Sequence, residues 1–356
     1  MPTFPSTLFP LRRRARIVIA AVLALSAAIA ALLCFSGLRD FSLESATTRT
    51  LTFHAGSDRL SGTLILPRDV AAPPVALFVH GDGPQDRYAD DGYQPFINQL
   101  LDQGIGVFTW DKPGVGRSAG NWLDQSMQDR AAEAMAAYLR VRSEPGVDAA
   151  KVGFLGYSQA GWVLPIVASR AQPAFTVIIG GAVNWRDQGA YYTRKRLQAQ
   201  GVAADEIERR LAAERTSNDA LFGEPRPLAD VLAARPDMTP ARARYVQRNY
   251  LSDASGWIPK MRGPVLAVWG EMDPNVDAAV NAARYRLLFA DAPDKRVMLV
   301  PDAGHVLLRA PQFNDQIASD WTLWKKLRFM LLGREAYVQP AVRDIADWIR
   351  QAAAGH

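Results

Sequence analysis

The sequence predicts an α/β fold with a mostly parallel, twisted sheet and helices on both faces, and three observations support this fold class. Short runs of β-branched and aromatic residues with few polar members are typical of strands buried on both faces. Helical patterns separate the early runs, and this alternation predicts βαβ units. Residues 151–169, KVGFLGYSQAGWVLPIVAS, change at Gly-Tyr-Ser from a strand pattern to a helical one without a linker. The predicted core strands comprise residues 75–81, 106–112, 151–157, 175–181, 264–270 and 296–302.

Residues 1–36 differ from the rest of the chain and are interpreted as a signal or anchor segment. Four arginines, at positions 12, 13, 14 and 16, precede the uncharged run from Ile17 to Phe35. A basic flank before such a run is typical of an export signal or of a single membrane-spanning helix with its N-terminus in the cytoplasm. Because no clean small-residue cleavage site follows, we expect an exported protein, membrane-anchored and facing the periplasm or exterior. A cleaved signal and a soluble exported protein are the alternative.

Charge and cysteine content exclude several function classes. The 356-residue chain has a formal net charge of +5, but without the four N-terminal arginines 37 basic residues stand against 36 acidic ones. Nucleic acid is therefore not an expected partner. The single cysteine, Cys34, lies inside the apolar run, so the exported part has no thiol for a disulfide, a Cys-ligated metal site or a Cys nucleophile.

The remaining chain divides into two parts of one core and an insertion. The first part, residues 37–184, opens with alternating apolar and polar residues from Thr48 to Pro67 around Gly-Ser-Asp, which predicts a β-hairpin. Residues 185–262 contain few strand-like runs and much charge at helical spacing, so we expect a helical cap inserted between two strands. The second part of the core is residues 263–356. Helical patterns in the first part lie near residues 93–103, 124–142 and 159–171.

Chemically useful side chains follow four of the predicted strands. In a doubly wound sheet, functional groups gather in the loops beyond the carboxyl ends of the strands. A serine, an acid and a histidine, each in such a loop, suit acyl transfer, because an imidazole must take the serine's proton and a carboxylate must orient that imidazole. The four loops begin with His80-Gly81-Asp82-Gly83, Ser158, Glu271-Met272-Asp273 and Ala303-Gly304-His305.

Over roughly residues 48–352 the chain resembles the α/β-hydrolase superfamily, because it has five of the family's motifs in the family's order along the sequence. GYSQAG resembles the family's nucleophile elbow, although Ala160 replaces the second glycine of the strict motif. HGDGPQDR resembles the oxyanion loop of bacterial esterase-like and serine-aminopeptidase-like members, and WDKPGVGRS resembles the loop after the following strand. WGEMDPNVD resembles the acid loop, and DAGH resembles the histidine loop. A long segment between His305 and the last helix departs from the family pattern.

The resemblance implies a role for each candidate site residue. Ser158 would attack the carbonyl, His305 would act as base and then as acid, and Asp273 would hold the imidazolium. The backbone N–H groups of Asp82 and Gln159 would bind the developing oxyanion. No cofactor and no metal are expected.

Other side chains in these loops have alternative interpretations. Glu271 and Asp277 compete with Asp273 as the acid, and Asp273 is favoured because the motif places the carboxylate there. Ser158 as a plain turn residue and His305 as a helix cap are the structural alternatives.

His80 precedes the elbow in the wrong order for the base and is expected to shape the oxyanion loop. Asp111 and Arg117 are expected to fix the loop between them by hydrogen bonds. The segment from Gly114 to Gly116 is a weak match to a dinucleotide loop, because Ala119 stands where a third glycine belongs.

The leading hypothesis is a serine hydrolase that cleaves carboxylic esters of small or medium size. An aminopeptidase or acyl thioesterase with the same triad is the first alternative, and a non-catalytic binding module on a hydrolase scaffold is the alternative from another class. The cap carries fourteen basic and ten acidic residues, which favours neutral or anionic substrates. Asp205, Glu206 and Glu208 are candidates for an ammonium-binding pocket, but their spacing among arginines favours a solvated face with i, i+4 pairs.

Residues 319–333, SDWTLWKKLRFMLLG, interleave aromatic and basic side chains. A basic amphipathic stretch of this kind can lie on a lipid surface. An ordinary helix packed near the mouth of the pocket is the favoured interpretation, and lipid contact is the alternative. The residues concerned are Trp321, Trp324, Phe329 and Met330, with Lys325, Lys326 and Arg328.

Overall fold

An eight-stranded sheet forms the centre of the computed structural model, which describes residues 16–24 and 36–355. The strand order is β1-β2-β4-β3-β5-β6-β7-β8. β1 and β2 form the predicted antiparallel hairpin, β2 is antiparallel to β4, and all other neighbouring pairs are parallel. The strands are β1 (Ala46–Ala55), β2 (Asp58–Pro67), β3 (Val75–Val79), β4 (Gly106–Trp110), β5 (Val152–Tyr157), β6 (Thr176–Ile179), β7 (Val265–Gly270) and β8 (Lys295–Val300).

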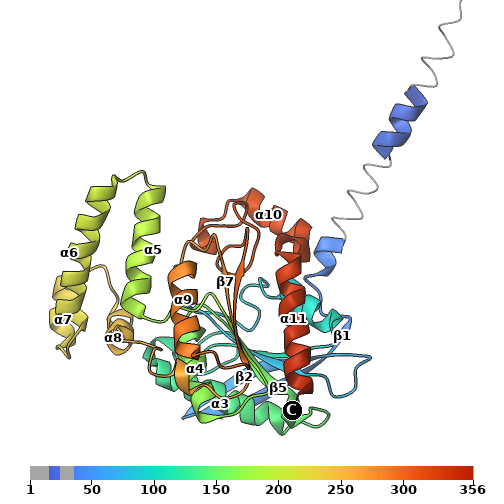
Figure 1. The fold of residues 1–356 in the computed structure, drawn as a ribbon, viewed down its shortest axis with the longest axis horizontal. Coiled ribbons are helices and arrows are strands. Elements are labelled where there is room, and N and C mark those ends of the chain that lie inside the picture. Colours follow the sequence, from blue (N-terminus) through green and yellow to red (C-terminus); the bar gives the residue numbers. More distant parts are fainter. Residues whose placement is uncertain (1–15, 25–35, 356) are drawn as a thin grey trace, which may run out of the picture.

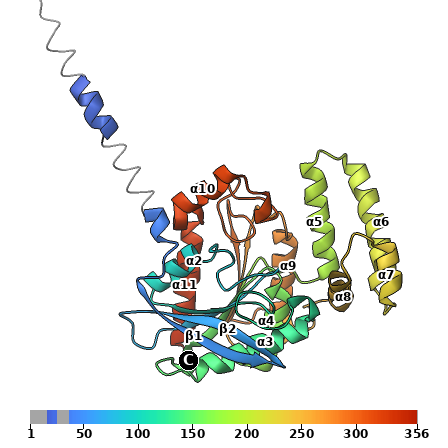
Figure 2. The ribbon, with the colours of Figure 1, turned by 180° about the vertical axis from the view of Figure 1, so that it is seen from behind.

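Helices cover both faces of this sheet, as the alternation of patterns predicts (Figures 1 and 2). One face packs against α3, α4 and α9, and the other packs against α2 and α11. The fold class expected from the sequence is therefore confirmed. The core helices are α2 (Gln94–Asp102), α3 (Met127–Arg142), α4 (Ala160–Arg170), α9 (Ala278–Phe289), α10 (Leu323–Leu332) and α11 (Gln339–Ala354).

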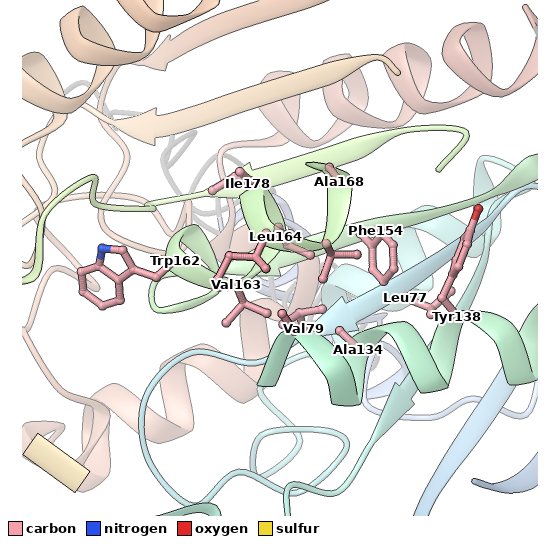
Figure 3. Close-up of a cluster of buried hydrophobic side chains, with 14 of the residues drawn as sticks. Leu77, Val79, Ala134, Tyr138, Phe154, Trp162, Val163, Leu164, Ala168 and Ile178 are labelled. Carbon is pink, nitrogen blue, oxygen red and sulfur yellow. The ribbon is translucent and has the colours of Figure 1, made fainter. Parts of the chain in front are cut away.

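The core beneath the elbow is tightly packed, and Figure 3 shows its side chains. Leu77 and Val79 of β3 and Phe154 of β5 meet α3 and α4 in one buried cluster. The rings of Tyr138 and Phe154 lie 5.2 Å apart between centroids. Ala134 of α3 adds little bulk in this layer, so the helix can approach the sheet closely. This packing fixes the position of α4 relative to β5, and thus of the turn between them.

Four helices lie between β6 and β7, which confirms the inserted helical cap: α5 (Trp185–Ala199), α6 (Ala204–Phe222), α7 (Leu228–Ala234) and α8 (Pro240–Asn249). Figure 1 shows α5 and α6 as a long pair that stands beside the sheet. Leu197, Ile207 and Leu211 form a small apolar cluster between them. A second cluster, around Phe222 and Val231, joins α6, α7 and α8. The cap therefore has apolar packing of its own, separate from the core of the sheet.

The N-terminal apolar run lies partly outside the described residues. Residues 16–24 form a helix whose apolar side chains are exposed, and residues 25–35 are not described. Within residues 16–24 and 36–355, no helix combines the length and the apolarity that a membrane crossing needs. The expectation of an uncleaved anchor stays a prediction.

Candidate active site

Ser158 stands on a strained turn between β5 and α4. Its backbone has φ = +54°, a left-handed conformation that side chains other than glycine rarely adopt. Small residues make the turn possible: a Cβ added to Gly156 would lie 2.5 Å from Cβ of Ala160, and one added to Gly161 would meet backbone atoms of the loop after β6 at 2.7 Å. The Ser158 N–H donates to the carbonyl of Ile179 at 2.8 Å, which ties the turn to β6.

Asp273 and His305 follow β7 and β8, and their side chains are hydrogen-bonded. His305 Nδ1 lies 2.7 Å from Asp273 Oδ2, and the carboxylate is completely buried. The other oxygen, Oδ1, accepts from the N–H groups of Asn275 at 2.7 Å and Val276 at 2.9 Å. Because a carboxylate can only accept, this contact places the imidazole proton on Nδ1 and leaves Nε2 as the acceptor.

The two other acids of this loop have different positions. Glu271 is exposed, and Asp277 caps α9 by accepting from the N–H of Val280 at 3.0 Å. Of the three acids that the sequence leaves as candidates, Asp273 is thus the one that contacts His305.

The imidazole of His305 packs against Gly180, where the chain again has a positive φ of +64°. A Cβ at Gly180 would lie 2.9 Å from His305 Nδ1, so a larger residue there would displace the ring. Ser158 and His305 line the same cavity, of about 750 Å³. In the described part of the chain no hydrogen bond joins the Ser158 hydroxyl to the imidazole, a contact that in many hydrolases forms only with substrate bound.

Asp82 and Gln159 border the same cavity beside Ser158. Neither of their backbone N–H groups donates a hydrogen bond within residues 16–24 and 36–355. The Gln159 side chain donates to Asp82 Oδ1 at 3.0 Å and so ties the loop after β3 to the start of α4. Two residues with unpartnered backbone N–H groups thus border the same cavity as Ser158, and an oxyanion hole requires such free donors.

His80 is a buried, neutral support of this loop. Burial lowers the pKa of His80 to about 3, although the hydrogen bond to Trp110 acts in the opposite direction. Its Nε2–H donates to the carbonyl of Trp110 at 2.5 Å, and its Nδ1 is buried without a partner. A ring engaged in this way does not serve Ser158 as a base. This agrees with the structural role expected for it.

Asp111 fixes its loop through the expected link to Arg117 and through a second partner, Arg87. The backbone N–H of Arg117 donates to Asp111 Oδ2 at 2.9 Å, as the expected link predicts. The ion pair of Asp111 is instead with Arg87, whose guanidinium lies 2.6 Å from Oδ2 and 2.9 Å from Oδ1. Arg87 comes from the HGDGPQDR loop, so this pair joins the oxyanion loop to the loop after β4.

Sequence reasoning missed two buried cations behind the oxyanion loop. Lys112 is 1% exposed, and its Nζ donates to the carbonyl of Gly81 at 3.1 Å. Arg130 is 4% exposed and donates to the carbonyl of His80 at 2.7 Å and to Oε1 of Gln159 at 2.5 Å. Within the described residues neither cation has a carboxylate partner at ion-pair distance.

The surroundings of Lys112 are unfavourable for its charge. Burial lowers the pKa of Lys112 well below its usual value, Arg130 lowers it further, and Asp82 and Glu133 partly oppose this change. The sequence gives only a weak indication that these two cations are buried at the site. Lys112 lies in the motif WDKPGVGRS, whereas Arg130 lies in a helical segment without a motif. Both cations hold main-chain carbonyls of the loop directly before Asp82, which borders the cavity.

The cavity continues from these loops into the cap. Aromatic residues Trp162, Trp185, Phe222 and Tyr250 line it, together with four arginines. The arginines, Arg186, Arg215, Arg235 and Arg242, come from the four cap helices or the loops next to them. Among the described residues, no group of three or more His, Cys, Asp or Glu side chains is arranged to hold a metal ion.

The three acids that the sequence suggests for an ammonium-binding pocket lie outside the cavity. Glu206 pairs with Arg209 and Arg210, and Glu208 pairs with Arg194. Glu206 and Glu208 do not line the cavity, and neither does Asp205.

Comparisons with known proteins agree with this architecture. The family model of the Alpha/beta hydrolase family matches residues 76–316. An esterase of Pyrococcus furiosus is similar in structure, with a TM-score of 0.56 and 14% identity over 86% of this chain and 92% of that chain. Carboxyl esterase 2 of the fungus Tuber melanosporum has a TM-score of 0.53 and 18% identity over 87% and 89% of the two chains. No curated protein matches the sequence. At these identities the solved structures establish the shared fold.

Proposed function

Because this chain belongs to the Alpha/beta hydrolase family, we propose that it is a serine hydrolase that cleaves carboxylic esters through an acyl intermediate on Ser158. The single observation that carries this proposal is the cavity shared by Ser158 and His305, whose imidazole contacts Asp273. Asp82 and Gln159, whose backbone N–H groups are free, border the same cavity.

In the proposed reaction, the Ser158 hydroxyl attacks the ester carbonyl while Nε2 of His305 takes its proton. Asp273 holds the Nδ1–H and stabilises the imidazolium that forms. The carbonyl oxygen becomes an oxyanion, which the N–H groups of Asp82 and Gln159 stabilise. Collapse of this intermediate breaks the ester C–O bond, and the imidazolium returns the proton to the leaving alcohol.

The second half of the reaction uses the same groups. Water gives a proton to Nε2 of His305 and attacks the acyl carbonyl. The second oxyanion then collapses, the bond to Ser158 Oγ breaks, and the serine recovers its proton. The net change is hydrolysis of one ester to a carboxylic acid and an alcohol, with no cofactor.

The side chains around the cavity favour esters over aminopeptidase substrates. An aminopeptidase must hold a free ammonium group, and a buried ammonium needs a carboxylate partner. The acids at the cavity are engaged or exposed: Asp82 bonds Gln159 and lies 3.5 Å from Arg242, Asp315 pairs with Lys325, and Glu214 is exposed. We therefore expect short-chain aryl esters to be cleaved at least about tenfold more efficiently than aminoacyl arylamides, which corresponds to about 1.4 kcal/mol in transition-state binding.

A fluorophosphonate probe followed by a substrate panel tests this function on the full chain. Labelling is expected in the parent and absent in Ser158→Ala. The panel then compares aryl esters, acyl thioesters and aminoacyl arylamides by kcat/KM. Absence of labelling with an intact fold would favour the non-catalytic binding module instead. Efficient arylamide cleavage would move the assignment to an aminopeptidase.

The cellular location is a separate proposal that follows from the N-terminal sequence. We expect export, with the apolar run from Ile17 to Phe35 retained as an anchor. A full-length protein that resists carbonate extraction from membranes would support the anchor, whereas a soluble form shortened by about 36 residues would indicate signal cleavage.

A further inference from the structure

One face of α10 is apolar and open to solvent. Leu327 is 38% exposed at its centre, and the stripe around it is more exposed still. At 100° per residue these side chains span about 120° of the helix surface, the width of a face that packs against a partner. The other members are Leu323 (70% exposed), Trp324 (79%), Met330 (43%) and Leu331 (41%).

The opposite side of α10 accounts for the rest of the predicted amphipathic stretch. Phe329 is buried and packs against Phe41, with ring centroids 5.5 Å apart, and against Trp321 at 5.4 Å. Lys325 pairs with Asp315 at 2.5 Å. Trp321, which the sequence grouped with the lipid-contacting aromatics, therefore belongs to the packed side. Trp324 belongs to the open side.

Two cations border the apolar stripe. Counted from Leu327, Lys326 and Arg328 lie about 100° to either side, just beyond the edges of the stripe. Both are exposed. An apolar face with a cation along each edge suits a bilayer surface, where the apolar side chains enter the acyl boundary and the cations meet lipid phosphates.

The N-terminal side of the domain lies against the same helix. Gly37 touches the end of α10 so closely that a Cβ there would lie 1.9 Å from the carbonyl oxygen of Leu331. Asp40 pairs with Arg334, just past α10, at 2.7 Å. The chain thus enters the domain at Gly37 next to the C-terminal end of α10, so a bilayer that held the preceding apolar run would lie close to this helix.

We propose that α10 docks on the surface of a bilayer that contains anionic phospholipid. A second copy of this chain is a poorer occupant, because a symmetric contact between two such faces would bring Lys326 and Arg328 of both copies together. Ile317 and Trp321, just before α10, line the cavity. In the docked state these two cavity-lining residues lie close to the lipid surface. This proposal does not rest on the proposed function.

A depth probe on the full chain tests the docking. Cys34 is the sole cysteine, so a Cys34→Ser background directs an environment-sensitive NBD label to Leu327→Cys. The matched control is Leu287→Cys on α9, where the leucine is 79% exposed. With vesicles of phosphatidylcholine and phosphatidylglycerol, we expect a blue shift at position 327 and quenching by brominated lipid, with neither at position 287. Thermal midpoints within about 2 °C of the parent would show that the labelled proteins are folded.

Each other outcome overturns the proposal. An unchanged signal at position 327 shows that the helix does not meet the bilayer. Equal quenching at both positions shows non-specific adsorption. A label at position 327 that is already shielded before vesicles are added shows that protein covers the face. In Lys326→Gln/Arg328→Gln the vesicle concentration for half-maximal quenching should rise about tenfold or more, and an unchanged value would refute the need for anionic lipid.

Discussion

His305 Nδ1 lies 2.7 Å from Oδ2 of a completely buried Asp273, whose second oxygen is held by two main-chain N–H groups. The carboxylate therefore has one orientation, and the imidazole has one tautomer. In Asp273→Asn the amide can offer an N–H to Nδ1, which reverses the tautomer and places the proton on Nε2. We expect kcat for an aryl ester to fall about 10⁴-fold, as in serine hydrolases with this change. Steady-state kinetics on Asp273→Asn measures the fall, with Asp277→Asn as the matched control from the same loop.

Two replacements of Ser158 distinguish the effect of its hydroxyl on activity from the effect of its strained backbone on stability. Ser158→Ala should lose ester turnover and probe labelling with little change in stability. Ser158→Gly should be equally inactive, and it should be the more stable of the two, because a non-glycine residue at φ = +54° costs roughly 1–2 kcal/mol. Urea denaturation of both variants checks the order, and turnover by either variant in a clean preparation would refute the nucleophile assignment.

Acid should destabilise the protein through His80. Its ordinary pKa is 6.5, and burial lowers the folded-state value to about 3, so between these values the unfolded chain binds the extra proton. Stability from this group is complete above pH 6.5 and is lost as the pH falls towards 3. At pH 4.5 the loss is about 3 kcal/mol relative to pH 7. In His80→Gln, which can still donate to the Trp110 carbonyl, this part of the decline should vanish, as denaturation at pH 7 and pH 4.5 will show.

Lys112 is a positioning residue, because its ammonium donates to the carbonyl of Gly81 and its side chain does not line the cavity. We expect Lys112→Met to lower kcat about tenfold, less than the loss of an oxyanion donor itself, with little change in KM. An equal loss in Lys151→Met, where the lysine is partly exposed and pairs with Asp148, would contradict this role.

The same variant tests the cost of burying the charge. Burial lowers the pKa of Lys112 well below 10.5, and between that lowered value and 10.5 the unfolded chain binds more protons. The parent should therefore gain stability as the pH rises through this window, and Lys112→Met should not. Thermal midpoints measured from pH 7 to pH 10 follow the difference between the two proteins.

Arg186 offers a buried Nε–H without a partner at the cavity, and its guanidinium lies 3.5 Å from Asp219. An acyl chain that ends in a carboxylate can satisfy this donor. In Arg186→Gln, kcat/KM for a p-nitrophenyl hemisuccinate should fall about tenfold, the usual effect of losing one charged hydrogen bond, and the value for p-nitrophenyl butyrate should change less than about twofold. Arg194→Gln, whose arginine pairs with Glu208 outside the cavity, is the control. Equal losses on both esters would indicate a structural role for Arg186.

The order of strands and helices could be read from the sequence because the signals are local. Alternation around Gly-Ser-Asp predicts the β1–β2 hairpin, and apolar runs separated by helical patterns predict β3 to β8 within one or two residues of their observed ends. The turn at Ser158 was equally readable, because only small residues at positions 156, 160 and 161 let a strand turn directly into a helix. These features depend on neighbours within a few positions.

Tertiary contacts decided the rest. Asp273, Glu271 and Asp277 have the same chemistry and nearly the same position in the sequence, and the packing of the loop after β7 brings Asp273 to His305. The packing of β4 and α3 behind the oxyanion loop brings two cations to its main-chain carbonyls: Lys112 reaches Gly81, and Arg130 reaches His80. Trp321 turned inwards and Trp324 outwards because Phe329 docks on Phe41, nearly three hundred positions away in the chain. Each of these choices depends on which distant side chain fills the adjacent space, and a periodic pattern along one segment carries no information about that.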